Sequence, residues 1–144
     1  MTKRADSLCP PCGEGGAAGF TPAALLCAQK AIASTIRKDE KALATLGAKQ
    51  PQGTAQQSRV ARQLRVLTLA AAFIGHALGE SPRPACTAPD LAEAADLLSA
   101  LTRQVQSILP KFKAGTPQHT LARRRVQAFQ IAQALIGRAQ TEAQ

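Results

Sequence analysis

Apolar residues recur at alternating intervals of three and four through most of this 144-residue chain. One such series is Val60, Leu64, Leu67, Ala71, Ile74 and Leu78. This spacing places the side chains on one face of an α-helix. The sequence holds no alternating run rich in β-branched residues and no Asn-Gly or Asp-Gly turn, which are the usual signals of strands and hairpins. We therefore expect an all-α protein.

Capping residues, prolines and glycines divide the chain into four helical segments. Thr21 and Thr116 each precede a proline, a pattern typical of a helix start. Thr87 and Asp90 have the spacing of a capping box. The predicted helices cover residues 22–47, residues 54–79, residues 88–110 and the segment that begins at residue 117. The connections between them are short, which favours antiparallel neighbours.

The predicted architecture is an antiparallel up-down-up-down four-helix bundle over residues 21–144, preceded by a flexible Cys/Gly/Pro-rich tail over residues 1–20. In the second helix, Val66, Leu69 and Phe73 form another apolar face beside the main series. A helix that is apolar nearly all round is either central or covers a partner. We expect a homodimer contact through these three residues.

Several classes of protein are disfavoured by what the sequence lacks. The longest apolar run, residues 67–75, is far shorter than the ~20 residues of a membrane-spanning helix. The N-terminus is charged and has no apolar stretch of a signal peptide, so we expect a cytoplasmic protein without a membrane partner. Neither a Glu-x-x-His pair, a phosphate-binding loop nor a serine elbow occurs. We expect no enzymatic activity and no organic cofactor.

Positive charge is concentrated in two segments. Residues 37–65 hold seven Lys and Arg against two acids, and residues 103–125 hold six against none. An up-down-up-down bundle would place both segments at one end, which we call the basic pole. Such a field attracts nucleic acid or acidic protein. The candidate partner-binding residues are Arg59, Arg62, Arg65, Lys111, Lys113, Arg123, Arg124 and Arg125.

The sequence leaves open whether the basic pole binds a partner at all, and whether it could bind duplex nucleic acid. A solvated face that keeps the bundle soluble is the alternative to a binding surface. Single-stranded nucleic acid is disfavoured because the sequence has no Trp or Tyr for base stacking, whereas duplex contact remains open. Asp39 is expected to pair with Arg59 or Arg62 across the first loop.

The four cysteines give a second candidate site at the opposite end of the predicted bundle. Cys9 and Cys12 have the C-x-x-C spacing of half a zinc site, and Cys27 and Cys86 are the nearest further ligands, with His76 as a substitute. A disulfide between Cys27 and Cys86, a disulfide to the tail, and unlinked thiols are the alternatives. The function expected from these cysteines is a metal-binding or redox-responsive sensor. A third function is a helical subunit or chaperone that docks a larger protein through the second helix.

Overall fold

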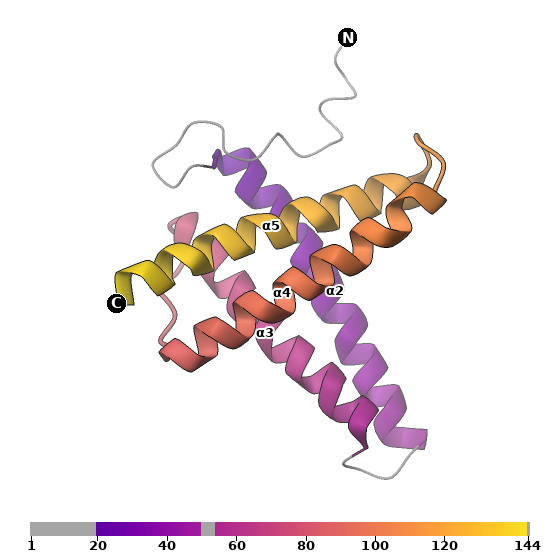
Figure 1. Ribbon diagram of the computed structural model, residues 1–144, viewed down its shortest axis with the longest axis horizontal. Coiled ribbons are helices and arrows are strands. Elements are labelled where there is room, and N and C mark those ends of the chain that lie inside the picture. The colour runs from indigo at the N-terminus through magenta and orange to yellow at the C-terminus, as the bar shows by residue number, and fades with distance from the viewer. Residues whose placement is uncertain (1–19, 50–53, 144) are drawn as a thin grey trace.

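The computed structural model describes residues 20–49 and 54–143, which form four α-helices and one 3₁₀ turn (Figure 1). The elements are α2 (Pro22–Lys49), α3 (Ala55–Ala77), α4 (Ala88–Ile108), η1 (Leu109–Lys111) and α5 (Pro117–Ala143). No strand occurs within those residues, and the helix–helix contacts are those of a helical bundle. The predicted all-α, four-helix class is confirmed. The predicted tail lies, except for Phe20, outside the described residues.

A threonine hydroxyl caps the N-terminus of every α-helix in the described part of the chain. The hydroxyl of Thr54 accepts the backbone N–H of Gln57 at 3.1 Å, and that of Thr87 accepts the N–H of Asp90 at 3.2 Å. The hydroxyl of Thr21 accepts the N–H of Ala24 at 3.1 Å, and that of Thr116 accepts the N–H of His119 at 3.3 Å. These bonds satisfy backbone donors that the first helical turn leaves unpaired. Each helix therefore begins where its threonine stands.

Gly79 explains why α3 ends where it does. Its φ of 80° is a left-handed conformation that residues with a Cβ rarely adopt. The N–H of Gly79 donates to the carbonyl of His76, and the N–H of Glu80 donates to the carbonyl of Gly75, both at 2.9 Å. This pair of bonds is the Schellman arrangement, which satisfies the last carbonyls of a helix and turns the chain away. The chain then runs through the proline-rich connection to α4.

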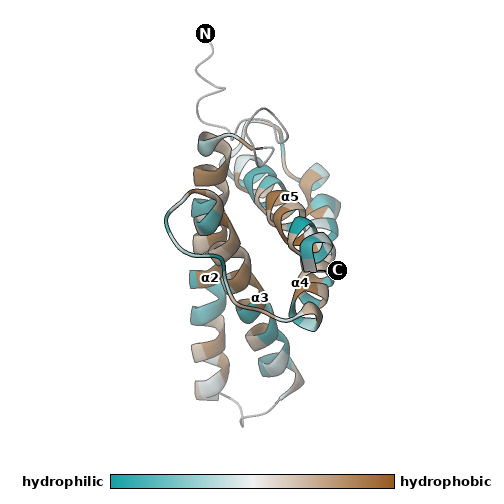
Figure 2. Cartoon of the chain, turned by 90° about the vertical axis from the view of Figure 1, so that its left-hand side faces the viewer, coloured by the Kyte–Doolittle hydropathy of each residue, from teal (hydrophilic) through white to brown (hydrophobic). Residues whose placement is uncertain are grey.

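The four helices form two antiparallel hairpins, α2–α3 and α4–α5, that cross each other (Figure 1). The view turned by 90° shows the hairpins as two layers (Figure 2). Helix α5 packs on both α2 and α3, whereas α4 packs on α5 and α3 and makes no contact with α2 among the described residues. The helices thus do not all run along one axis. The crossing separates the loop ends of the two hairpins.

The core lies between the two layers. The largest fully buried side chains are Ile32, Leu67, Ile74, Leu98, Ile131 and Ile136. Alanines fill the remaining positions, and Ala28 of α2 and Ala128 and Ala132 of α5 are at most 1% exposed. Since the separation of packed helices depends on the side chains at their contact, alanines let α5 lie close to α2. Small side chains therefore provide much of the packing in a chain with few aromatic residues.

The buried face of α3 differs from the predicted series. Val66 and Phe73, expected at a homodimer contact, are 3% and 5% exposed within the single chain. Leu69 is half-buried and packs against the same core. Val66 and Phe73 are therefore core residues and are not available to a second copy, because α3 lies between α2 on one side and the crossing hairpin on the other. Homodimerisation through this helix stays a prediction. The apolar sector of α3 is broad because helices cover it from both sides. Val60, Leu64 and Leu78, which belong to the predicted series, are only half-buried.

Candidate partner-binding surface

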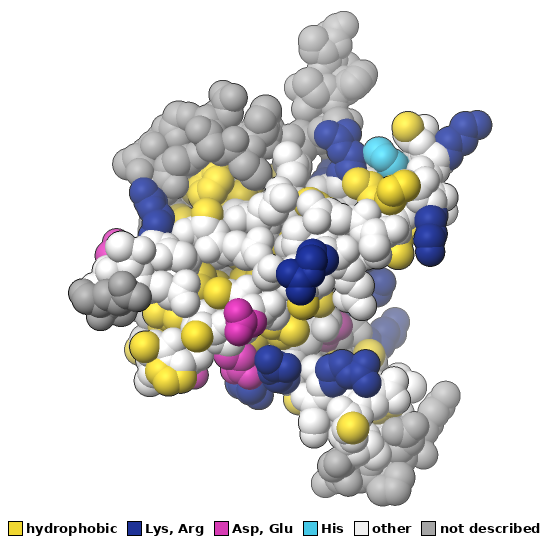
Figure 3. Space-filling model, viewed as in Figure 1, with side chains coloured by type: hydrophobic (Ala, Val, Ile, Leu, Met, Phe, Trp, Pro, Cys, Tyr) yellow, Lys and Arg dark blue, Asp and Glu magenta, His cyan; other side chains and the backbone are white. Residues whose placement is uncertain are grey.

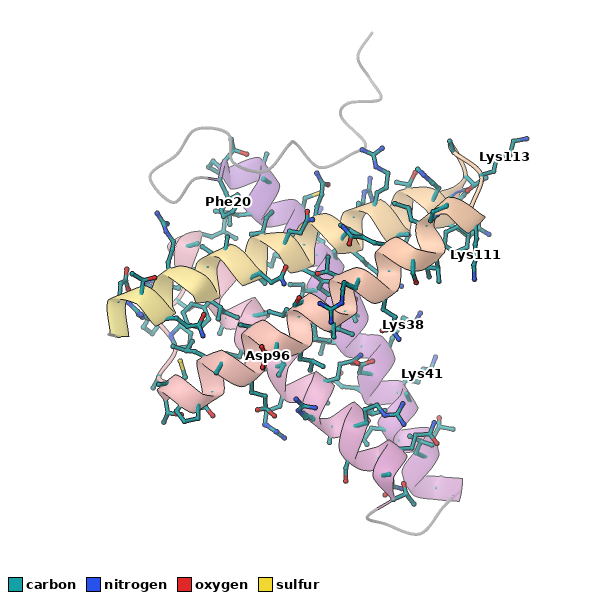
Figure 4. The ribbon with its side chains drawn as sticks, viewed as in Figure 1. Phe20, Lys38, Lys41, Asp96, Lys111 and Lys113 are labelled. Carbon is teal, nitrogen blue, oxygen red and sulfur yellow. The ribbon has the colours of Figure 1, made fainter. Side chains whose placement is uncertain are left out.

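The crossing of the hairpins divides the predicted basic pole into two. The end of α2 and the start of α3 form one tip, and the end of α4 and the start of α5 form the other; we call them the first and second basic tips (Figure 1). Lys38 and Lys41 lie on α2 towards the first tip, and Lys111 and Lys113 lie at the second (Figure 4). All four side chains are exposed and lie on the same side of the molecule. The positive charge is thus shared between two separate tips on one side.

Of the eight candidate residues, four are freely presented. Arg59, Lys111, Lys113 and Arg123 are exposed. Arg124 and Arg125 are only half-exposed, and their Nε atoms are buried without a hydrogen-bond partner among the described residues. These two arginines contribute charge to the second tip but present little of their side chains to a partner.

Arg62 and Arg65 are tied to α4. The Nε of Arg62 lies 2.7 Å from Oε2 of Glu93, and Nη2 of Arg65 lies 3.5 Å from the same oxygen. One carboxylate therefore neutralises part of the charge of two predicted binding residues. Their side chains are 47% and 65% exposed, so this pairing contributes little to stability. Its main consequence is to link α3 to α4 near the point where the two helices cross.

Asp39 does not pair with Arg59 or Arg62, as the sequence had suggested. Its Oδ2 accepts a hydrogen bond from Nε2 of Gln63 at 2.8 Å. Burial raises the pKa of Asp39, and the Gln63 hydrogen bond and the charges of Lys38 and Arg125 offset only part of that effect. Asp39 is thus a partly buried link between α2 and α3, facing Arg125 of α5. It forms no ion pair with a described Lys or Arg side chain, although the charges of Lys38 and Arg125 act on it.

A groove of about 520 Å³ opens between α3 and α4 on the side of the Arg62–Glu93 pair that faces the two tips. Helix α3 contributes Gln56, Arg59, Val60 and Gln63, and α4 contributes Leu97, Ala100, Leu101, Arg103 and Gln104. Leu101 is 8% exposed, and Val60 and Leu97 are half-buried. The groove thus has an apolar floor between arginine and glutamine side chains. None of the described residues that line it is Asp or Glu.

The two arginines of this groove form no ion pair with a carboxylate of the described residues. Nη1 of Arg103 donates to the hydroxyl of Ser99 at 2.9 Å, and Arg59 makes no ion pair within residues 20–49 and 54–143. The charge pattern of the sequence indicated Arg59 as a candidate. It did not single out Arg103 or the apolar floor, because the groove exists only where two hairpins cross. The one local signal was the spacing of residues 56, 59, 60 and 63, which places them on one helix face.

The structure describes two of the four cysteines that the sequence had grouped. Cys27 is disulfide-bonded, whereas Cys86 is a free, half-buried thiol, so the predicted disulfide between these two residues is wrong. Cys9 and Cys12 lie outside the described residues. His76 is exposed, and its Nδ1 lies 3.0 Å from the carbonyl oxygen of Ser81 in the turn after α3. Within the described ranges, no three His, Cys, Asp or Glu side chains form a group that could hold a metal ion. Zinc binding and a sensor function remain predictions.

Comparison with protein-family models, with curated proteins and with solved structures finds no match to this chain. In the described part of the chain, no helix combines the length and the apolar character needed to cross a bilayer. The function must therefore be inferred from the surface itself.

Proposed function

We propose that this protein is a non-enzymatic binding module that holds an acidic protein partner across its two basic tips. The observation that carries the proposal is that lysines towards the two tips are exposed and unpaired within the described residues, whereas most described acidic side chains bond to other residues of the chain. Lys38, Lys41, Lys111 and Lys113 are exposed, and none of them forms an ion pair with a described residue (Figure 4). This charge is available to a partner.

Five of the seven acidic side chains in the described residues, in contrast, form hydrogen bonds or ion pairs within the chain, whereas Glu40 is an exposed acid beside Lys41. Glu93 pairs with Arg62 and Arg65, Glu142 pairs with Arg83, and Glu80 accepts a hydrogen bond from Gln29 at 2.8 Å. Asp90 accepts the N–H of Thr87 in a capping box, which lowers the pKa of Asp90. Asp96 lies on the first half of α4, away from both tips (Figure 4). Figure 3 shows Lys and Arg side chains around the tips on this face.

The two tips supply a field that attracts an anion over a distance and then holds it. Clustered charges of one sign raise the local concentration of the opposite ion and speed association. Because the surface is exposed, the attraction weakens as salt screens it. Two separate clusters fit an elongated acidic segment better than a compact anion, since both can be engaged only by a partner that spans them.

We expect the loss of charge at either tip to weaken the binding of fluorescent poly-L-glutamate. The variants are Lys38→Gln/Lys41→Gln at the first tip and Lys111→Gln/Lys113→Gln at the second. At low salt each should lose affinity by roughly tenfold and show a shallower decline of affinity with salt. Fluorescence anisotropy over a series of NaCl concentrations measures both quantities.

A matched double variant away from the tips gives the control. Lys30 and Arg138 are also exposed, and their replacement by Gln removes the same charge. Equal losses in all three double variants would show that only net charge matters, which contradicts a site at the tips. Tighter binding of duplex DNA than of poly-L-glutamate at the same salt, lost in both tip variants, would assign the tips to nucleic acid instead.

A further inference from the structure

The α3–α4 groove is lined by a helical stripe from each of its two walls. Its lining includes a set at positions 56, 59, 60 and 63 of α3 and a set at positions 97, 100, 101 and 104 of α4, with Arg103 beside the α4 set. Both sets follow the same i, i+3, i+4, i+7 pattern, so each helix turns one complete stripe into the groove. Eight residues of helix extend about 11 Å. Each stripe therefore spans about two helical turns.

The chemistry of the groove selects an amphipathic occupant. Val60, Leu97 and Leu101 form an apolar floor, which favours side chains such as leucine on the facing side of a partner. Arg59 and Arg103 stand on opposite walls, one on each helix. Both guanidinium groups lack an ion-pair partner in the described residues, and each can bind a carboxylate with two hydrogen bonds. An occupant with carboxylates on both flanks would meet both walls.

We propose that the groove binds an acidic amphipathic helix of the partner, with apolar residues on the floor and Asp or Glu residues against Arg59 and Arg103. This inference rests on the proposed function, because the charge of the tips draws the acidic segment to the groove between them. A nucleic acid fits this groove less well. Phosphates would face an apolar floor, and the described lining holds no aromatic side chain that could stack on a base.

Filling the groove without changing its charge tests this proposal. Ala100 is an exposed residue of the lining, so Ala100→Trp should occupy the groove without disturbing the core. The probe is a fluorescent helical peptide of about 18 residues with Leu at i, i+3, i+4 and i+7 and Glu on both flanks. We expect Ala100→Trp to weaken its binding by at least about tenfold. Arg59→Gln/Arg103→Gln should weaken it as well.

Two controls separate a blocked groove from a general effect. Ala92→Trp places the same side chain on an exposed position of α4 that does not line the groove, and it should leave the affinity unchanged. A peptide with Lys in place of every Glu should not bind. Thermal unfolding followed by circular dichroism establishes that both Trp variants are folded.

The outcomes distinguish the groove from the tips. Unchanged peptide binding by Ala100→Trp, together with its loss in the tip variants, would overturn the groove and leave the proposed function standing. Weakened binding by Ala100→Trp with no effect of the tip variants would retain the groove and overturn the role of the tips. Loss of duplex DNA binding alone in Ala100→Trp would assign the groove to nucleic acid. If the protein dimerises, Ala100→Trp is monomeric and the peptide does not bind, the occupant is a second copy of the chain, which also overturns the proposal.

Discussion

Replacing Phe73 with alanine is expected to lower the free energy of unfolding by about 3–5 kcal/mol. Phe73 is 5% exposed and belongs to the main hydrophobic core of the chain. It lines a cavity together with Leu135 and Ala139 of α5, so it joins the end of α3 to the crossing hairpin. Truncation to alanine removes the ring from this contact and leaves a void that the rigid helices fill only in part. Urea denaturation followed by circular dichroism measures the loss.

The same experiment distinguishes a core residue from a dimer contact. Leu69→Ala, one turn earlier on α3 and only half-buried, should cost less, on the order of 1 kcal/mol. The midpoint of unfolding should not change with protein concentration for the wild type or for either variant. A midpoint that rises with concentration in the wild type, and no longer does so in Phe73→Ala, would instead place Phe73 between two copies of the chain.

Enlarging Ala128 to leucine is expected to destabilise the protein by about 1–3 kcal/mol, although leucine is the more hydrophobic residue. Ala128 has no solvent exposure and lies on α5, the helix that packs on both α2 and α3. The close approach of these helices depends on side chains as small as those of Ala28 and Ala128. The additional carbon atoms would force neighbouring side chains out of their preferred rotamers or push the helices apart.

Ala134→Leu is the matched control, because Ala134 is an exposed residue of the same helix. Its effect on the free energy of unfolding should stay within about 0.5 kcal/mol. Urea denaturation curves of the two variants and the wild type give both values. A gain in stability for Ala128→Leu would mean that α5 packs against its neighbours more loosely than the structure shows.

The positions of the helices could be predicted from the sequence because the signals that set them are local. Thr54 and Gln57 form a capping box from residues three apart, and the Schellman motif at Gly79 uses the last turn of α3 and the two residues after it. These interactions need no knowledge of the remaining chain. Each helix accordingly begins at the expected threonine.

The relative orientation of the two hairpins could not be predicted in the same way. Short connections imply antiparallel neighbours but do not fix the angle between one hairpin and the next. That angle depends on how side chains of α5 fit those of α2 and α3, which lie far apart in sequence. Because the hairpins cross, the basic segments that were predicted to share one pole lie at two separate tips.

The candidate site shows the same division between local and long-range information. Charge counting identified Arg59, but it could not show that Arg62 and Arg65 share Glu93, which lies 31 and 28 residues further along the chain. Nor could charge counting show that Leu97 and Arg103 of α4 lie opposite the groove-lining residues of α3. The groove arises only from the packing of one hairpin on the other, which also explains why Val66 and Phe73 are core residues.

The most direct test of this surface is a titration of the isotope-labelled 144-residue chain with the Glu-flanked peptide, followed by amide chemical shifts in ¹H–¹⁵N NMR spectra. We expect the shift changes to concentrate in residues 56–63 and 97–104, the two stripes that line the groove. Smaller changes should appear around Lys38, Lys41 and Lys111. Changes confined to other surfaces, with both stripes unaffected at saturating peptide, would contradict a partner seated between the two basic tips.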